Sequence, residues 1–285
     1  MEVRRRLKMK NKVLKVAVGG LAVSMIGLFA YQAKVEGNAM DKFPYAYIVP
    51  EAIKESLAFE VRKEETEEEA SLRAQFQLFT KANLETVRAM ESDGDYSTLE
   101  GIQHVANLEV FGGEGETSVV DPRLLSKNTK MKNLEISGSF YSIDFLKNLS
   151  KLERFDLRNT SETTDEYRAL LGENDHRVRP LFDLSVLDTL NNLKHFGVKS
   201  EGFTEPIALK KSMTSYAMVS PFVLPQKFVD ENTNVTIESD DQNFSYNDEV
   251  LTWEQLSPDT KELHFSWDVK GMNYYGKATI PIIWK

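Results

Sequence analysis

Large apolar residues recur along the middle of the chain with the spacing apolar-x-x-apolar-x-apolar. The four copies are Val105/Leu108/Val110, Met131/Leu134/Ile136, Leu152/Phe155/Leu157 and Leu193/Phe196/Val198. Their first positions lie 26, 21 and 41 residues apart, which fits a unit of about 21 residues. Each copy has the length of one short strand. The pattern therefore predicts a curved parallel sheet to which every unit contributes a strand.

The chain between the strands carries a second repeated pattern. Apolar residues recur every three positions in residues 146–152 and again in residues 187–193, which is typical of a short 3₁₀ turn. A weaker copy runs from Val120 towards Met131. Strand and return turn at this period define a leucine-rich repeat, a solenoid in which neighbouring units bury their leucines together. The polar interval 160–180 is either a degenerate repeat or an inserted loop.

Different patterns flank the repeats on both sides. Residues 44 to about 92 carry apolar positions at helical spacing, which predicts an α-helical cap over the end of the array. From about residue 207, short alternating strands are separated by Asn, Asp, Pro and Gly, which predicts a β-sandwich. The prediction is a multidomain chain with a helical cap (40–96), a short leucine-rich-repeat solenoid (97–206) and a C-terminal β-sandwich (207–285).

The first 39 residues predict an export signal. Seven basic residues precede an uncharged, mostly apolar stretch from 16 to 33, and residues 37–39 offer a small-x-small cleavage site. An uncleaved membrane anchor is the alternative, because the eighteen uncharged residues are at the lower limit for spanning a bilayer. Both interpretations place the body of the protein outside the cell.

Charge and cysteine content exclude several classes of function. The formal net charge is −9, and removal of residues 1–39, with eight Lys/Arg and two Asp/Glu, would leave −15. A surface this acidic repels nucleic acid and anionic lipid, so neither is an expected partner. The chain has no cysteine, which excludes disulfides, thiol catalysis and thiolate metal sites.

No motif for catalysis or cofactor binding is present in the sequence. The four histidines are scattered over different expected elements, without the spacing of a zinc site. Residues 112–115 are glycine-rich but lack the lysine of a phosphate loop, and no Gly-x-Ser-x-Gly occurs. Residues 93–95 and 240–243 are expected to be turns rather than calcium sites. The sequence therefore predicts a protein that is not an enzyme and has no cofactor or metal.

Several segments together resemble a known family. Residues 99–108 are similar to its first repeat, and residues 145–157 and 183–196 to its central repeats. Residues 250–253 followed by 263–267 are similar to its closing Ig-like domain. In this combination and order the chain resembles the internalins, the leucine-rich-repeat surface and secreted proteins of Gram-positive bacteria. The resemblance covers nearly all of residues 45–285 and implies an Ig-like fold for the β-sandwich.

The chain also departs from the internalins. The family's asparagine after each strand is missing at most turns, and Asn159 sits one residue early. No Leu-Pro-x-Thr-Gly sorting signal follows the last strand, so covalent attachment to the cell wall is not expected. Resemblance to the short secreted members implies an extracellular virulence or colonisation protein whose partner is a host protein. An envelope-retained structural or adhesive protein of the producing bacterium is the alternative, and the oligomeric state stays open.

Residues that flank the buried strand positions are expected to face the concave side of the sheet. The expected partner-binding rows are Asn107/Glu109/Phe111, Asn133/Glu135/Ser137, Arg154/Asp156/Arg158 and His195/Gly197/Lys199. The rows change from acidic with one aromatic residue to basic. Mixed charge with an aromatic anchor is typical of a recognition surface, and an ordinary solvated strand face is the alternative.

Overall fold

The computed structural model describes most of the chain after residue 44. The described residues are 45, 46, 48, 51–61, 79–90, 94–96, 98–112, 117–119, 121–160 and 178–285. The chain divides into two units, Met1–Ala46 and Tyr47–Lys285. Strand β1 (Tyr45–Ala46) belongs to the first unit. The expected export signal and residues 161–177 lie outside the described residues, so both remain predictions.

The beginning of the second unit contains helices and very short strands. Its elements are α2 (Glu51–Val61), β2 (Phe79–Thr80), α4 (Lys81–Thr86), β3 (Ala89–Met90) and β4 (Gly94–Tyr96). Helix α2 buries Ile53, Leu57 and Val61, which lie four residues apart along one helix face. The Thr80 hydroxyl caps α4 by accepting a hydrogen bond from the Asn83 N–H at 3.1 Å. Helices therefore occur in the segment for which a cap is predicted.

The helical pattern expected up to about residue 92 is wrong at its C-terminal end. Leu84, Val87 and Met90 have the spacing of a helical stripe, but β3 follows α4 and pairs in parallel with β5 (Val110–Phe111). Apolar residues three apart fit a repeat unit equally well. Residues 89 and 90 therefore form a strand rather than a helix, because they pair with the neighbouring unit.

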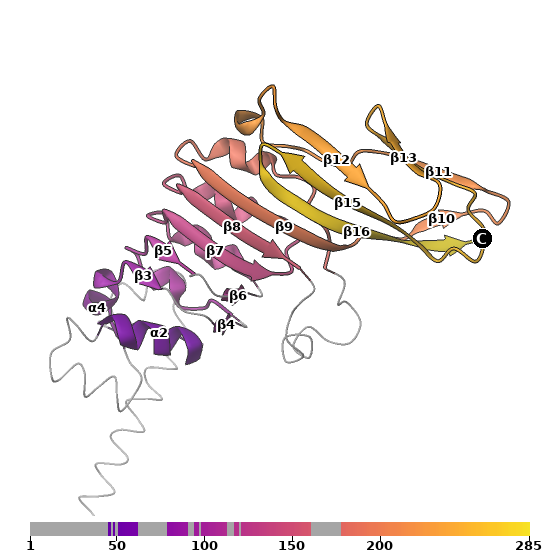
Figure 1. Cartoon of the computed structure of the whole chain (residues 1–285). Helices are drawn as coiled ribbons and strands as arrows, with labels where there is room; N and C mark the ends of the chain where they lie inside the picture. The colour runs from indigo at the N-terminus through magenta and orange to yellow at the C-terminus, as the bar shows by residue number, and fades with distance from the viewer. Residues whose placement is uncertain are drawn as a thin grey trace, which may run out of the picture. The chain divides into compact units, whose positions relative to one another are not determined.

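The four predicted strand segments lie beside one another in one parallel sheet, which confirms a leucine-rich-repeat type of fold. The strand order is β3-β5-β7-β8-β9, and each pair is parallel (Figure 1). The remaining strands of this part are β6 (Thr117–Val119), β7 (Asn133–Gly138), β8 (Arg154–Asn159) and β9 (His195–Phe203). Leu134, Phe155 and Phe196 stand in register across three strands and are buried.

Short 3₁₀ turns return the chain between the strands. They are η2 (Ile102–His104), η3 (Pro122–Lys127), η4 (Asp144–Asn148) and η5 (Ser185–Thr189). After η4, the Leu149 N–H donates to the Leu146 carbonyl at 2.8 Å, and the Leu152 N–H donates to the Leu149 carbonyl at 2.9 Å. All three leucines are fully buried. The three-residue spacing in the sequence is thus confirmed as a 3₁₀ turn that packs one leucine per turn.

Two buried asparagines connect neighbouring units. The Asn128 amide donates to the Ile102 carbonyl at 3.0 Å. The Asn159 amide accepts from the Phe140 N–H at 2.7 Å and donates to the Arg179 carbonyl at 2.8 Å. Although Asn159 lies one residue early for the family pattern, its side chain bonds to the turns before and after its own strand. Such buried amides satisfy backbone groups that the irregular turns leave unpaired.

The C-terminal part forms two sheets, one of which is continuous with the repeats. Its elements are β10 (Ile207–Leu209), β11 (Ser215–Val219), η6 (Gln226–Phe228), β12 (Asn234–Glu238), β13 (Phe244–Asn247), β14 (Val250–Glu254), β15 (Glu262–Lys270) and β16 (Asn273–Trp284). Strands β11, β14 and β13 form an antiparallel sheet of their own, whereas β12, β15 and β16 extend the repeat sheet.

The junction between the two parts is a parallel pair of strands. Strand β16 pairs with β9 from Asn273 opposite Gly197 to Thr279 opposite Phe203 (Figure 1). Strand β9 has nine residues against six in β8, and its extra length pairs with β16. The sequence predicts two domains that meet near residue 206. In the structure a single sheet contains strands from both predicted domains, because β9 pairs with β16.

Aromatic residues fill the space between the two C-terminal sheets. The Trp253 ring on β14 lies 6.3 Å from the Phe265 ring on β15, and the Phe265 ring lies 6.0 Å from that of Trp267. Trp267 in turn packs edge-on against Tyr274 of β16 at 5.8 Å. All four rings are buried. The alternation predicted for residues 263–269, with apolar side chains on one face, is confirmed by the burial pattern of β15.

Candidate functional site

The outward side chains of β7, β8 and β9 lie in straight rows. Because successive residues of a strand point to opposite faces, every second residue faces away from the 3₁₀ turns. We call this the open face of the sheet. The three rows are Asn133–Arg154–His195, Glu135–Asp156–Gly197 and Ser137–Arg158–Lys199. The register brings these nine sequence-predicted residues together on one surface.

The rows continue onto β16, which the sequence does not predict. Asn273 stands opposite Gly197, and Tyr275 stands opposite Lys199. Tyr275 is 43% exposed, whereas its neighbour Tyr274 is fully buried. The exposed aromatic residue of the open face is therefore Tyr275. Alternation within the aromatic pair could have indicated it, but the parallel pairing of β16 with β9 is needed to place it here.

A shallow hollow occupies the centre of the open face. Gly197 lies beneath it and is buried, because the Asp156 Oδ1 and the Asn273 Nδ2 each lie 2.5 Å from the place that a Cβ atom would take. The hollow has a volume of about 230 Å³. The polar side chains around it are Glu135, Ser137, Arg154, Asp156, Arg158, Lys199, Asn273 and Tyr275. The depression therefore lies among side chains from four strands, and a larger residue at position 197 would collide with Asp156 and Asn273.

Ion pairs within the open face hold its charged groups in place. The Arg154 Nε lies 2.6 Å from Asp156 Oδ2, and this hydrogen bond raises the pKa of Arg154. Lys199 Nζ lies 3.2 Å from Glu201 Oε1. These contacts fix side chains that would otherwise lose rotamer freedom on binding. The face presents cations, carboxylates, an amide and a phenol, which can form hydrogen bonds but include no activated nucleophile.

The first predicted row is wrong. Phe111 is only 1% exposed, and its ring packs 5.7 Å from that of Tyr96, so it is not a surface anchor. Asn107 lies in a turn, where its amide donates to the Glu85 carbonyl at 2.6 Å. Glu109 precedes β5 and is paired to Lys132. None of the three residues belongs to the rows of the open face.

The error comes from an ambiguous register in the first repeat. Val110 stands opposite Asn133 and Phe111 opposite Leu134, so Leu108 and Phe111 are equivalent to Met131 and Leu134. The corrected intervals between units are 23, 21 and 41 residues. Because Val105, Leu108 and Val110 happen to have the same spacing, the sequence pattern alone selects an alignment shifted by three residues.

A row of alternating charges crosses the sheet just before the strands. The Lys132 Nζ lies 2.5 Å from Glu109 Oε2, and the Lys194 Nζ lies 2.6 Å from Glu153 Oε2. The hydrogen bond from Lys132 lowers the pKa of Glu109, and the hydrogen bond from Lys194 lowers that of Glu153. Each cation here is paired with a carboxylate of the neighbouring unit. We therefore interpret this row as a contact between units rather than a ligand site.

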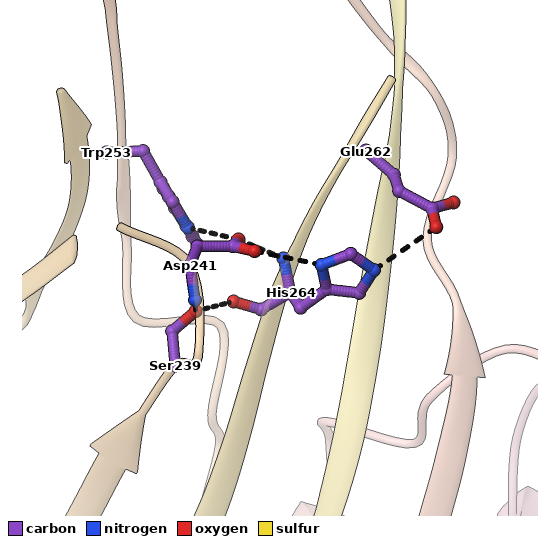
Figure 2. Close-up of polar contacts among 5 residues, drawn as sticks. All are labelled: Ser239, Asp241, Trp253, Glu262 and His264. Atoms are coloured by element: carbon purple, nitrogen blue, oxygen red, sulfur yellow. Dashed lines mark hydrogen bonds and ion pairs between the residues drawn. The ribbon is translucent and has the colours of Figure 1, made fainter. Parts of the chain in front are cut away.

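A histidine between two carboxylates lies in the C-terminal part (Figure 2). Asp241 Oδ1 is 3.0 Å from His264 Nδ1, and Glu262 Oε1 is 3.3 Å from Nε2. Asp241 Oδ2 also accepts from the His264 N–H at 2.6 Å and from the Trp253 indole N–H at 3.1 Å. The Ser239 hydroxyl donates to the His264 backbone carbonyl at 2.5 Å.

This cluster has the geometry of a structural clasp. Burial lowers the pKa of His264, but hydrogen bonds and charge from Asp241 and then Glu262 outweigh that effect and raise the pKa above its usual value. Both ring nitrogens face carboxylates, which leaves neither one free to activate a nucleophile. Through Trp253 and His264, Asp241 connects the two C-terminal sheets.

Across the described ranges, no three His, Asp or Glu side chains converge as a ligand set for a metal ion. Within those ranges, no helix has both the length and the apolar character needed to cross a membrane.

Among solved structures, this chain is similar to internalins and internalin-like proteins from Listeria monocytogenes. The functional domain of InlJ has 16% identity and a TM-score of 0.46 over 72% of this chain and 45% of the other. The secreted internalin-like protein Lmo2445 has 13% identity and a TM-score of 0.39, and the match covers 83% of this chain and 95% of the other. Internalin C2 has 20% identity and a TM-score of 0.37, and the match covers 53% of this chain and 64% of the other. The chain thus spans less than half of the InlJ structure. No family model and no curated protein matches the sequence.

Proposed function

We propose that this chain is a non-enzymatic interaction module that binds a protein through the open face of its sheet. The observation that carries the proposal is the hollow over Gly197, with Tyr275 and the basic residues Arg158 and Lys199 at its edge. Tyrosine and arginine are the residue types that most often dominate the binding energy of protein interfaces. Here they converge from separate strands on one surface.

The size of the hollow favours a protein partner over a small molecule. Sites for drug-sized ligands usually enclose about 300–1000 Å³, whereas this hollow measures about 230 Å³ and is open to solvent. It has room for a side chain that projects from a larger surface. The flanking rows would contact the partner around that side chain, as the polar rim of an interface does.

The rigidity of the face would assist binding. Its residues lie on strands that hydrogen-bond to neighbours on both sides, and Arg154 is held by Asp156. A surface that is already ordered loses less conformational entropy when a partner docks. Affinity can then come from a few well-placed contacts.

The proposal extends to the parts that flank the repeats. The helices before β3 would cap the array, and the two sheets packed on Trp253 would be an Ig-like domain. Residues 1–39 would direct export, so that the body acts outside the producing cell. A host protein as partner, with a role in colonisation or virulence, follows from the resemblance to the internalins.

The proposed face is tested with two variants matched in chemistry. A partner is first captured from host and bacterial lysates with the wild-type chain. Its Kd is then measured for Tyr275→Ala on the open face and for Tyr141→Ala, an exposed tyrosine 59% accessible in the turn after β7. We expect Tyr275→Ala to raise the Kd by about tenfold or more, and Tyr141→Ala to leave it unchanged. Equal behaviour of the two variants would refute the assignment of the face.

A further inference from the structure

Strand β11 is an edge strand of unusual composition. It pairs with β14, and within the described residues no strand lies on its other side. Residues 212–226, which include β11, contain no charged side chain, although 28% of the whole chain is charged. Ser215, Ala217 and Val219 are exposed, and Val219 is 69% accessible. Proteins usually protect an edge strand with charges, because its free backbone groups can pair with another chain.

The free backbone groups of β11 can be assigned from its register. The Ser220 N–H donates to the Glu249 carbonyl on the β14 side at 2.7 Å. In an antiparallel ladder, alternate residues direct both backbone groups to the same neighbour. Ser215, Ala217 and Val219 therefore direct their N–H and C=O groups away from β14. These free positions are symmetrical about Ala217.

The other edges of these sheets are protected in a way that β11 is not. Strand β12 ends at Glu238 and is followed by Asp240 and Asp241, and β13 is followed by Asp248 and Glu249. Two copies paired along either edge would bring carboxylates together, in a chain whose net charge is already −9. Pairing along β11 would place no like charges opposite each other within the strand.

We propose that a second copy of this chain pairs antiparallel with β11, so that the three-stranded sheets of two copies become one continuous sheet. Ala217 would face Ala217 of the second copy across a two-fold axis, and Ser215 would face its Val219. Each of these positions would exchange both backbone hydrogen bonds, since all lie on the free side. The contact is isologous, so it closes at a dimer.

Charges at the ends of β11 favour this orientation. Lys210 and Lys211 precede the strand, and the Asp248–Glu249 turn lies beside its other end, next to Ser220. All four charged side chains are exposed. Antiparallel pairing brings the basic end of one copy to the acidic end of the other, whereas parallel pairing would bring like ends together. This complementarity indicates a second copy as the occupant of the edge.

The test measures self-association of the full chain by analytical sedimentation over a range of protein concentrations. Wild type is expected to form a reversible dimer. Ala217→Lys and Ala217→Glu should each raise the dissociation constant by about tenfold or more, because like charges meet at the axis. An equimolar mixture of the two variants should regain a dimer, since Lys and Glu then face each other. Circular dichroism and the Tm show that each variant is folded.

Thr236→Lys is the matched control, because Thr236 is an exposed residue of the β12 edge. It should dimerise like wild type. The proposal is overturned if wild type remains monomeric, which would leave the β11 edge to a foreign strand or to solvent. It is also overturned if Ala217→Lys and Thr236→Lys associate equally well. Failure of the Lys and Glu variants to form a mixed dimer, while each alone is monomeric, contradicts the proposed register.

Discussion

The repeat array and the C-terminal part of this chain bury their cores in different ways. In the array, Leu149 and Leu152 are fully buried and each donates its N–H to the carbonyl three residues earlier, so this part of the core depends on chain segments nearby in the sequence. In the C-terminal part, Trp253 meets Phe265 across two sheets, and Tyr274 donates to the Leu181 carbonyl, 93 residues away, at 2.6 Å. Because the core contacts of the array join residues close in the sequence, the array can be predicted from the sequence. The core contacts of the C-terminal part join residues far apart in the sequence and connect the two parts.

The largest expected effect comes from removing one core ring in each part. Phe155→Ala and Trp253→Ala each delete a fully buried ring and should each lower the unfolding free energy by about 3–5 kcal/mol. Because β9 and β16 share a sheet, both variants should shift one common transition in urea, followed by circular dichroism. Two separate transitions, with each variant moving only its own, would mean that the two parts unfold independently.

A smaller loss is expected from Asn159→Ala. The substitution leaves the buried Phe140 N–H without its partner, which costs about 1–3 kcal/mol, whereas the carbonyl of the exposed residue Arg179 can bind water instead. We therefore expect a decrease of about 1–3 kcal/mol in the unfolding free energy, measured in urea. Asn148→Ala, at an exposed position of η4, is the control and should be neutral. If both substitutions cost the same, the amide bridge between units has no special importance.

The smallest effect concerns the clasp at His264 and depends on pH. Its folded-state pKa is raised, so the charged ring stabilises the fold below the unfolded pKa, and this contribution is lost as pH rises through the folded pKa. The stability advantage of wild type over His264→Gln should thus be greatest in mild acid and decline above neutrality. Thermal unfolding of both proteins from about pH 5.5 to 8.5 measures this. An advantage that grows with pH would contradict the ion-pair interpretation.

The parts of the fold that sequence could predict are those with a local physical cause. Leucines every three residues in 146–152 specify a 3₁₀ turn, and alternation in 263–269 specifies a half-buried strand. The sequence misplaces Phe111 because Val105, Leu108 and Val110 match the strand spacing, and only the pairing of β5 with β7 shows that Phe111 stands opposite Leu134. The place of Tyr275 on the open face depends on β16 pairing with β9, about 75 residues earlier in the chain. No pattern of apolar and polar residues within either strand indicates that the two strands pair.

The parallel pairing of β9 with β16 also affects the order in which the chain can fold. On the ribosome, β9 is synthesised long before residues 273–279, which later cover its open edge. Until then that edge presents unpaired amides to the surroundings, and β15 also lacks one neighbour. A nascent chain halted before residue 273 would therefore expose the unpaired edges of both β9 and β15. Binding of a chaperone at this stage would prevent these edges from pairing with other chains and aggregating.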